Sequence, residues 1–197
     1  MALSFALTDE EKAYLLRLAR ASIASGLAGD LDAAVPPPPA PDASGGALGR
    51  PLGGVVTLVL RGNLRGCIGN IVGHEALRAT IWHMARAAAF SDPRFPPLTA
   101  GEWPHVRLDI TVLDEPTPCA DPDAIEVGRH GLVLQYGGRS GVFLPQVPVE
   151  QGWDRLAYLN HLCRKAGVPV GAWAWPGARI YWYEAAVFGG PAVPQTE

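Results

Sequence analysis

The sequence has little net charge, few cysteines and no long hydrophobic run, and each of these absences excludes a class of protein. Its 197 residues carry 16 Lys and Arg against 19 Asp and Glu, so the formal charge is only -3. That balance supplies no strong electrostatic attraction to nucleic acid or to an anionic membrane surface. No apolar run approaches the roughly 20 residues of a membrane-spanning helix, and the first residues lack the features of a signal peptide. We therefore expect no membrane segment, and we rank nucleic-acid binding lowest among the functions, although 14 Arg against 2 Lys could form one local basic face.

The cysteine count and the missing cofactor signatures indicate which compartment, cofactors and enzyme classes to expect. Cys67, Cys119 and Cys163 cannot all be paired, so we expect no disulfide framework and a cytoplasmic, reducing compartment. The sequence also lacks C-x-x-C, H-E-x-x-H, G-x-G-x-x-G and the Walker pattern, which are the compact signatures of zinc and nucleotide-cofactor sites. We accordingly expect no metal and no cofactor. The absence of G-x-S-x-G argues against a serine hydrolase.

Hydrophobic patterning predicts an α+β chain with a mainly antiparallel sheet and packed helices. A capping box at Thr8 to Glu11 predicts a helix that ends at Gly26 or Gly29. Two more helices are predicted over about 74–90 and 153–166. Predicted strands cover 53–60, 64–69, 106–113, 131–136, 141–144 and 180–188. Strict β–α–β alternation is absent, which argues against a doubly wound fold.

Proline marks the segments that we expect to be irregular. Residues 30–50 contain Pro36 to Pro39 and Pro41, and proline removes amide donors and restricts φ. This stretch is predicted to be an exposed surface loop, partly polyproline II. The segment from Pro145 to Pro148 is predicted to be a second loop.

The first candidate site is the segment LRGCIG, in which Gly66 and Gly69 bracket Cys67 just after a predicted reversal. Glycine weakens a strand, so it usually marks a bend or a close backbone approach. In a regular strand Arg65 lies on the same face as the thiol, where a cation favours the reactive thiolate. Cys67 is therefore a candidate nucleophile. The alternative is a small buried hydrophobic residue, because free cysteine is among the most buried residue types.

Three further segments hold polar side chains between proline or glycine residues. Asp92 and Arg94 flank a proline in SDPRFPP and present a carboxylate and a guanidinium, either to a ligand or to each other. His130 lies between glycines and is a candidate acid or base near neutral pH, or else a solvated turn residue. Gln146 follows one proline and precedes another, which restricts its backbone.

A shared role for these segments predicts a single concave site for a small polar or anionic ligand, since guanidinium groups bind carboxylate and phosphate. The residues expected to line it are Arg65, Cys67, Asp92, Arg94, His130 and Gln146. In one hypothesis Cys67 is a catalytic nucleophile with His130 as its base. In the other the same segments form a non-catalytic binding surface, and Cys67 only packs.

Together these motifs resemble the AMMECR domain family, whose bacterial members are called AmmeMemoRadiSam system protein A. The resembling segments follow family order and cover most of the chain from Gly53 on, within residues 53–190. They are VTLVLRGNLRGCIGN (56–70), AAAFSDPRFPPLT (87–99), LDITVLDEP (108–116), VGRHGLVLQYGGRSGVFLPQVPVEQGWD (127–154) and LCRKAG (162–167). Residues 30–50 depart from the compact family pattern, so we expect them to be peripheral.

The resemblance implies one domain of the AMMECR type over residues 1–197, built from two closely associated subdomains that share a cleft. It also implies that LRGCIG is the functional motif and that the protein acts with a Memo-type protein and a radical-SAM protein. The chain has no C-x-x-x-C-x-x-C run, so radical chemistry would belong to the partner. The resemblance leaves open whether the chain is an enzyme component or an adaptor module.

Overall fold

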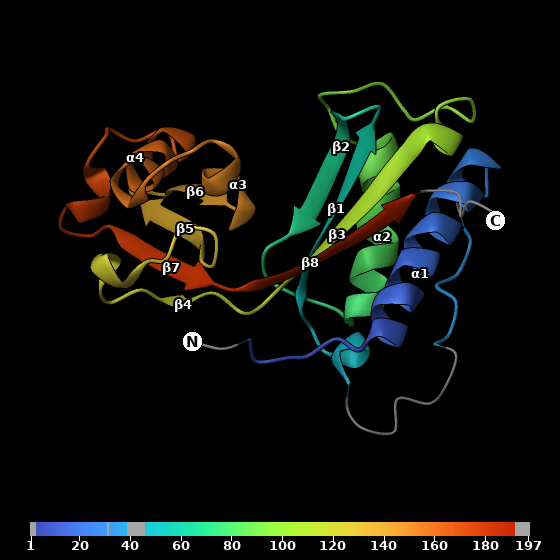
Figure 1. Ribbon diagram of the computed structural model, residues 1–197, viewed down its shortest axis with the longest axis horizontal. Coiled ribbons are helices and arrows are strands. Elements are labelled where there is room, and N and C mark those ends of the chain that lie inside the picture. The colour runs from blue at the N-terminus through green and yellow to red at the C-terminus, as the bar shows by residue number, and fades with distance from the viewer. Residues whose placement is uncertain (1–2, 31, 39–45, 192–197) are drawn as a thin grey trace. The chain divides into compact units, whose positions relative to one another are not determined.

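The computed structural model describes residues 3–30, 32–38 and 46–191, and the chain forms two compact units (Figure 1). The large unit contains Ser4–Leu113 together with the chain from Ala186 on, and the small unit contains Asp114–Ala185. Each unit has a four-stranded sheet with helices. The fold is therefore α+β with antiparallel sheets, as the sequence predicts.

The sheet of the large unit has the order β2-β1-β3-β8, and β1 is antiparallel to both of its neighbours. Its strands are β1 (Gly53–Leu60), β2 (Asn63–Asn70), β3 (Val106–Leu113) and β8 (Ala185–Pro191). Helix α2 (Leu77–Phe90) packs on β1 and β2, and α1 (Asp9–Leu27) packs on α2 (Figure 1). Short 3-10 turns lie at Ala47–Gly49 and Trp103–His105. The strand β2 is thus an edge of this sheet.

Helix α1 begins where the sequence predicts. The Thr8 hydroxyl accepts from the amide of Glu11, and the Glu11 carboxylate accepts from the amide of Thr8. The helix then buries its apolar stripe, including Leu15 and Ile23, while the Ser22 hydroxyl donates to the Trp82 carbonyl of α2 at 2.7 Å. Local capping and burial of one face therefore act together to set this helix.

The sheet of the small unit has the order β4-β7-β5-β6, with antiparallel pairing throughout. Its strands are β4 (Thr117–Pro118), β5 (Gly131–Tyr136), β6 (Arg139–Phe143) and β7 (Arg179–Tyr183). Helix α4 (Arg155–Lys165) is capped by Asp154, whose carboxylate accepts from the Ala157 amide at 2.7 Å. Leu132, Leu134, Tyr158 and Leu162 are fully buried in its core. Turns at Pro122–Ala124 and Ala172–Ala174 complete this unit.

Two predicted elements differ in the structure. The final strand, expected over 180–188, is divided at Glu184 into β7 of one sheet and β8 of the other. The predicted loop at Pro145–Pro148 contains a short helix, α3 (Gln146–Glu150). Pro148 fits there because a proline in the first turn of a helix removes no intrahelical hydrogen bond.

The proline-rich segment is irregular in its described part, but it is not exposed throughout. Residues 32–38 form no helix or strand, whereas Ala47 and Leu48 are buried in a 3-10 turn. Residues 31 and 39–45 lie outside the described residues. The second helix begins at Leu77 and not near His74. In the part of the chain that the structure describes, no helix is long and apolar enough to cross a membrane.

Candidate functional site

Arg65 lies in a β-bulge, which removes it from the regular strand that the motif suggests. Leu58 pairs with Gly66, but the next residue, Val59, pairs with Leu64, so Arg65 has no partner in β1. A bulge of this kind redirects the side chain of the extra residue. The regular i, i+2 spacing that would place Arg65 beside the thiol is therefore interrupted at this point.

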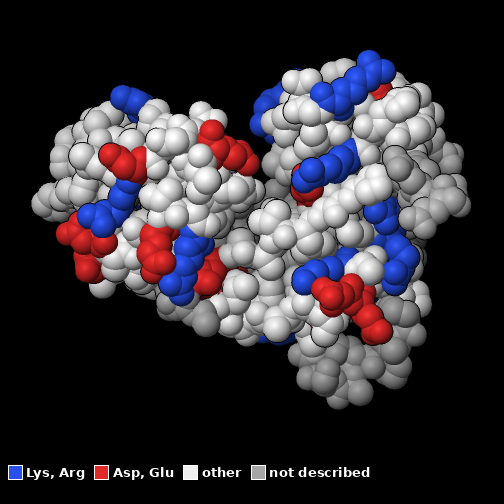
Figure 2. All heavy atoms as spheres, viewed as in Figure 1, with Lys and Arg blue, Asp and Glu red and all other residues white. Residues whose placement is uncertain are grey.

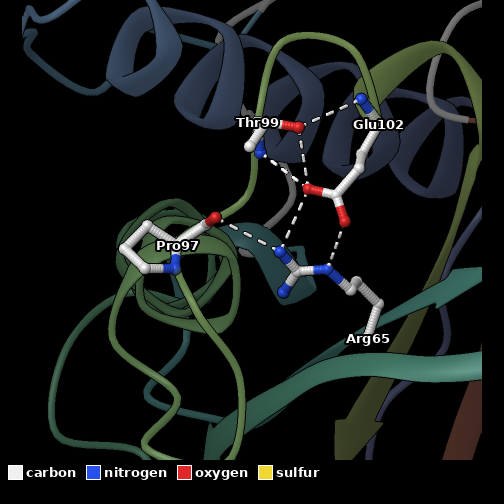
Figure 3. Close-up of polar contacts among 4 residues, drawn as sticks. All are labelled: Arg65, Pro97, Thr99 and Glu102. Atoms are coloured by element: carbon white, nitrogen blue, oxygen red, sulfur yellow. Dashed lines mark hydrogen bonds and ion pairs between the residues drawn. The ribbon is translucent and has the colours of Figure 1, made fainter.

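The Arg65 side chain is buried in an ion pair with Glu102 (Figure 3). Its Nε lies 2.8 Å and its Nη2 lies 3.1 Å from the two carboxylate oxygens, and Nη2 also donates to the Pro97 carbonyl at 3.2 Å. The Arg65 hydrogen bonds, followed by that from the Thr99 amide, lower the pKa of Glu102 to about 2. This pair fastens the loop after α2 to the edge strand β2.

Asp92 and Arg94 hold the backbone of Cys67 from the open edge of the sheet. The Cys67 amide donates to Asp92 Oδ2 at 2.9 Å, and Arg94 Nη2 donates to the Cys67 carbonyl at 3.1 Å. Arg94 also binds both carboxylate oxygens of Asp92, at 2.9 and 2.7 Å. These hydrogen bonds from Arg94 keep the pKa of the buried Asp92 far below its ordinary value, against the opposing effect of burial. The two side chains thus pair with each other, and they form hydrogen bonds with the amide and the carbonyl that Cys67 presents at the edge of the sheet.

The thiol of Cys67 lies in a polar row that crosses three strands. Thr57 of β1 is directly opposite Cys67 in β2 and Asp109 in β3, so their side chains share one face of the sheet. The Thr57 hydroxyl donates to Cys67 Sγ at 3.2 Å, and the thiol is partly exposed. The Asp109 carboxylate is paired with Arg107 at 2.9 Å. Residues of β1, β2 and β3 therefore combine a thiol, a hydroxyl and a carboxylate.

Arg94 is the cation that interacts with Cys67. Its side chain is 54% exposed, and its pKa is raised chiefly by hydrogen bonds to Asp92 and also by Cys67. Sequence patterns pointed to Arg65 as the cation near the thiol, and they did not single out Thr57, Asp109 or Glu102. Thr57 and Asp109 were recognisable only as polar residues within predicted strands, because their alignment with Cys67 depends on strand register.

The two motif glycines have a packing role. A Cβ on Gly66 would lie 2.1 Å from the Ala88 carbonyl oxygen of α2, and one on Gly69 would lie 2.4 Å from the Val55 side chain. Both positions require the absence of a side chain because neighbouring elements approach closely. Gly66 thus lets α2 pack directly on the strand that carries Cys67.

His130 belongs to the small unit and has a local structural contact. Its Nδ1 accepts from the Glu126 amide at 3.0 Å, which places the remaining proton on Nε2 in the neutral ring. The ring is buried and lies 4.8 Å from that of Trp182, and Nε2 is buried without a hydrogen-bond partner among the described residues. Burial, with a smaller contribution from Arg129, lowers the pKa of His130. At neutral pH the ring is therefore uncharged.

The predicted residues fall into two groups by unit. Arg65, Cys67, Asp92 and Arg94 lie in the large unit, where the hydrogen bonds above connect Cys67 with Asp92 and Arg94. His130 and Gln146 lie in the small unit, and Gln146 Oε1 is buried without a described partner. Convergence of all six on one site stays a prediction.

Among the residues that the structure describes, acidic and basic side chains form ion pairs, and no three possible metal ligands form a cluster. On the face shown in Figure 2, acidic and basic side chains are interspersed over each unit. The ion pairs of the small unit include Arg155 with Asp123, and Arg129 with Glu126 and Glu184. Within residues 3–30, 32–38 and 46–191, no three His, Cys, Asp or Glu side chains are grouped so as to hold a metal ion.

Comparison with known proteins identifies the family. The AMMECR1 family model matches residues 16–188. A protein of Methanopyrus kandleri is 39% identical over 92% of this chain and 89% of its own length, and one of Methanosarcina acetivorans is 36% identical over 92% of both. The crystal structure of an uncharacterised protein of Pyrococcus horikoshii superposes with a TM-score of 0.87 at 34% identity, covering 95% of this chain and 96% of that one. These three relatives are archaeal, and the chain belongs to the AMMECR1 family.

Proposed function

We propose that the chain is an enzyme, or a component of one, which binds a small polar or anionic ligand at Cys67 and uses the thiol as a nucleophile. The observation that carries this proposal is the way Cys67 is held. Its backbone is fixed from the sheet edge by Asp92 and Arg94, while its thiol, on a partly exposed residue, accepts from Thr57. Catalytic and binding sites typically hold a reactive group in one geometry, on a rigid strand and with hydrogen bonds from charged, partly buried neighbours.

Arg94 supports an anionic or carbonyl-bearing ligand. Its side chain is more than half exposed, and its Nε and Nη2 are the nitrogens engaged by Asp92 and the Cys67 carbonyl. The remaining nitrogen, Nη1, can therefore donate to a bound oxygen beside the thiol. Guanidinium groups are well suited to carboxylate and phosphate oxygens. We propose Arg65 only as a support of this site, because Glu102 and Pro97 engage its Nε and Nη2.

A non-catalytic binding module is the second candidate function. It is favoured by the internal contacts of Arg65 and Asp92, which occupy two of the side chains that the sequence analysis assigned to a substrate. In this module Cys67 contributes surface and packing, and a ligand or partner protein contacts Arg94 and Thr57. The role of His130 as a base for Cys67 also stays a proposal. The Nδ1 atom of His130 already accepts a hydrogen bond from the Glu126 amide, so it is not free to take a proton from the thiol.

The Cys67→Ser variant separates the two candidates. Purified wild-type and variant proteins are incubated with a small-molecule extract, and the metabolites consumed or bound are measured by mass spectrometry. If the chain is an enzyme, the wild type should convert at least one compound that the Cys67→Ser variant leaves unchanged. A binding module predicts equal retention of the same compound by both proteins with no conversion. Thr57→Val is the matched variant, because it removes the hydroxyl that donates to the sulfur while keeping the side-chain shape.

We also propose a cytoplasmic, bacterial-type system in which the chain acts with a Memo-type protein and a radical-SAM protein. The support is the resemblance of the LRGCIG, DPRF and LPQVP motifs to the AMMECR family. Co-expression of the three proteins from one genome, followed by size-exclusion chromatography, tests the complex. Co-elution of this chain with either partner is the expected result, and separate elution of all three contradicts it.

A further inference from the structure

We propose that the small unit carries a second binding site, for a small phosphate-bearing molecule, at the turn between β5 and β6. A hollow of about 340 Å³ is lined there by residues 135–140 with Gly177 and Arg179. All of these residues belong to Asp114–Ala185. The site is therefore independent of the function proposed for Cys67 in the large unit.

Strand register places three hydrogen-bonding side chains in a row at this hollow. Gln135 of β5 is directly opposite Ser140 of β6 on one side and Arg179 of β7 on the other. Side chains of directly opposed residues lie on the same face of a sheet and are close enough to contact one ligand. A hydroxyl, an amide and a guanidinium are thus available together, and all three residues are exposed.

The charge at the hollow is positive and is not balanced by a carboxylate. Arg139 and Arg179 line it, and no Asp or Glu is among the lining residues that the structure describes. Arg139 is fixed in place, because its Nη1 donates to the Gly167 carbonyl. By contrast, Arg129 and Arg155 of the same unit are each paired with acidic side chains. Arg179, on the same face as Gln135 and Ser140, is therefore the guanidinium that we propose to contact an anion, and Arg139 adds positive charge nearby.

The size and donor count of the hollow favour phosphate over carboxylate. Small-molecule sites span roughly 300–1,000 Å³, so this hollow is suited to a compact ligand. A phosphate group has three acceptor oxygens and about two negative charges, which match the Arg179 guanidinium together with the Ser140 hydroxyl and the Gln135 amide. Tyr136 adds an aromatic wall and is supported edge-on by Trp175, with ring centroids 5.8 Å apart.

A second basic hollow, in the large unit, meets these conditions less well. It is lined by Arg61, His105 and Arg107 among others, and its volume is about 800 Å³. Arg107 is already paired with Asp109 at 2.9 Å, so part of its charge is neutralised. The hollow of the small unit is therefore the stronger anion site.

Titration of the full chain with inorganic phosphate at constant ionic strength, followed by amide NMR, tests the proposal. We expect saturable shifts confined to Gly137, Gly138 and their neighbours. Arg179→Gln should weaken binding about tenfold or more, because a charge-assisted contact is lost, while Arg179→Lys should retain much of it. Acetate should bind about tenfold more weakly than phosphate, and equal binding of acetate would contradict the phosphate assignment.

Arg164→Gln is the matched control, since it removes the same charge from an exposed position in α4 outside the hollow. It should leave phosphate affinity unchanged. Shifts that never saturate, or equal weakening by Arg164→Gln and Arg179→Gln, would mean an adventitious ion only and would overturn the proposal. Both variants are exposed substitutions, so an unchanged amide spectrum in the absence of phosphate verifies that each is folded.

Discussion

A β-bulge at Arg65 interrupts the regular spacing by which the LRGCIG motif would place Arg65 beside Cys67. Without the bulge, Arg65 and Cys67 would share one face of β2 at i, i+2 spacing. With it, the Arg65 guanidinium is buried against Glu102, and Arg94 supplies the cation at Cys67. At the residue scale, the motif therefore combines one buried, paired arginine with one partly exposed cysteine.

Replacing Glu102 by Gln should destabilise the protein by about 2–3 kcal/mol, because it leaves the buried Arg65 charge without its partner. The side chains of Arg65 and Glu102 are 9% and 29% exposed. Lys12→Gln is the control, since Lys12 pairs with a fully exposed Asp9 and such pairs contribute about 0.5 kcal/mol or less. Urea unfolding measures both, and equal stability of the Glu102→Gln variant and the wild type would contradict the assignment.

The same ion pair predicts an acid-sensitive stability. The pKa of Glu102 is lowered from 4.5 to about 2 in the folded protein. The ion pair therefore contributes its full stabilisation to the folded state at pH values above the pKa of Glu102 in the unfolded chain. It is lost as the pH falls through the folded value, and Asp92, whose pKa is also lowered, acts in the same direction. The free energy of unfolding should thus decline between about pH 5 and pH 2.5, and less steeply in Glu102→Gln. An identical slope in wild type and variant would exclude the pair as the cause.

At the element scale, strand β2 is contacted by helix α2 on one face of the sheet and by the loop after α2 along its open edge. Helix α2 approaches so closely that Gly66 has no room for a side chain, and the loop after α2 satisfies the backbone of Cys67. The polar loop takes the place of a further strand at this edge. It thereby protects the edge from pairing with another chain.

Gly66→Ala should destabilise the large unit by about 2–3 kcal/mol through overpacking. The added Cβ would lie 2.1 Å from a backbone oxygen of α2, which cannot move without shifting the helix. Gly101→Ala is the matched control, because no atom lies within 4 Å of its added Cβ and its φ is not positive. Thermal unfolding should separate the two variants, and similar midpoints would contradict the close approach.

Asp92→Asn tests the loop contact directly. The loss of the carboxylate should raise hydrogen exchange at the Cys67 amide about tenfold or more, since that amide donates to Asp92. The amide of Val56 in the central strand is an internal reference and should exchange at the same rate in both proteins. Unchanged protection of Cys67 would show that another group holds its amide.

Sequence patterns were sufficient to predict elements that are determined by neighbouring residues. They were insufficient where strand register or tertiary packing determines the structure. The capping box at Thr8 predicted the start of α1, because its partners lie three residues apart. The bulge at Arg65 depends on pairing with β1, which no local pattern encodes. The division of the last strand at Glu184 likewise depends on two separate sheets, each requiring one half of an apparently continuous strand.

At the scale of the whole molecule, the chain leaves the large unit after Leu113 and returns at Ala186. This path puts Arg65, Cys67, Asp92 and Arg94 in one unit and His130 and Gln146 in the other. The α+β class and the family followed from strand patterns and motifs spread along the chain. The grouping of the candidate residues did not, because it depends on where the strands exchange sheets.

Time-resolved thiol labelling tests the central claim most directly, namely that Cys67 presents an accessible, positioned thiol. The folded protein is treated with a thiol reagent at neutral pH, and each cysteine is followed by mass spectrometry. We predict that Cys67 reacts first, because it is partly exposed, whereas Cys163 is fully buried and burial raises the pKa of Cys119. Labelling of Cys67 as slow as that of Cys163 would contradict the account and leave Cys67 as a packing residue.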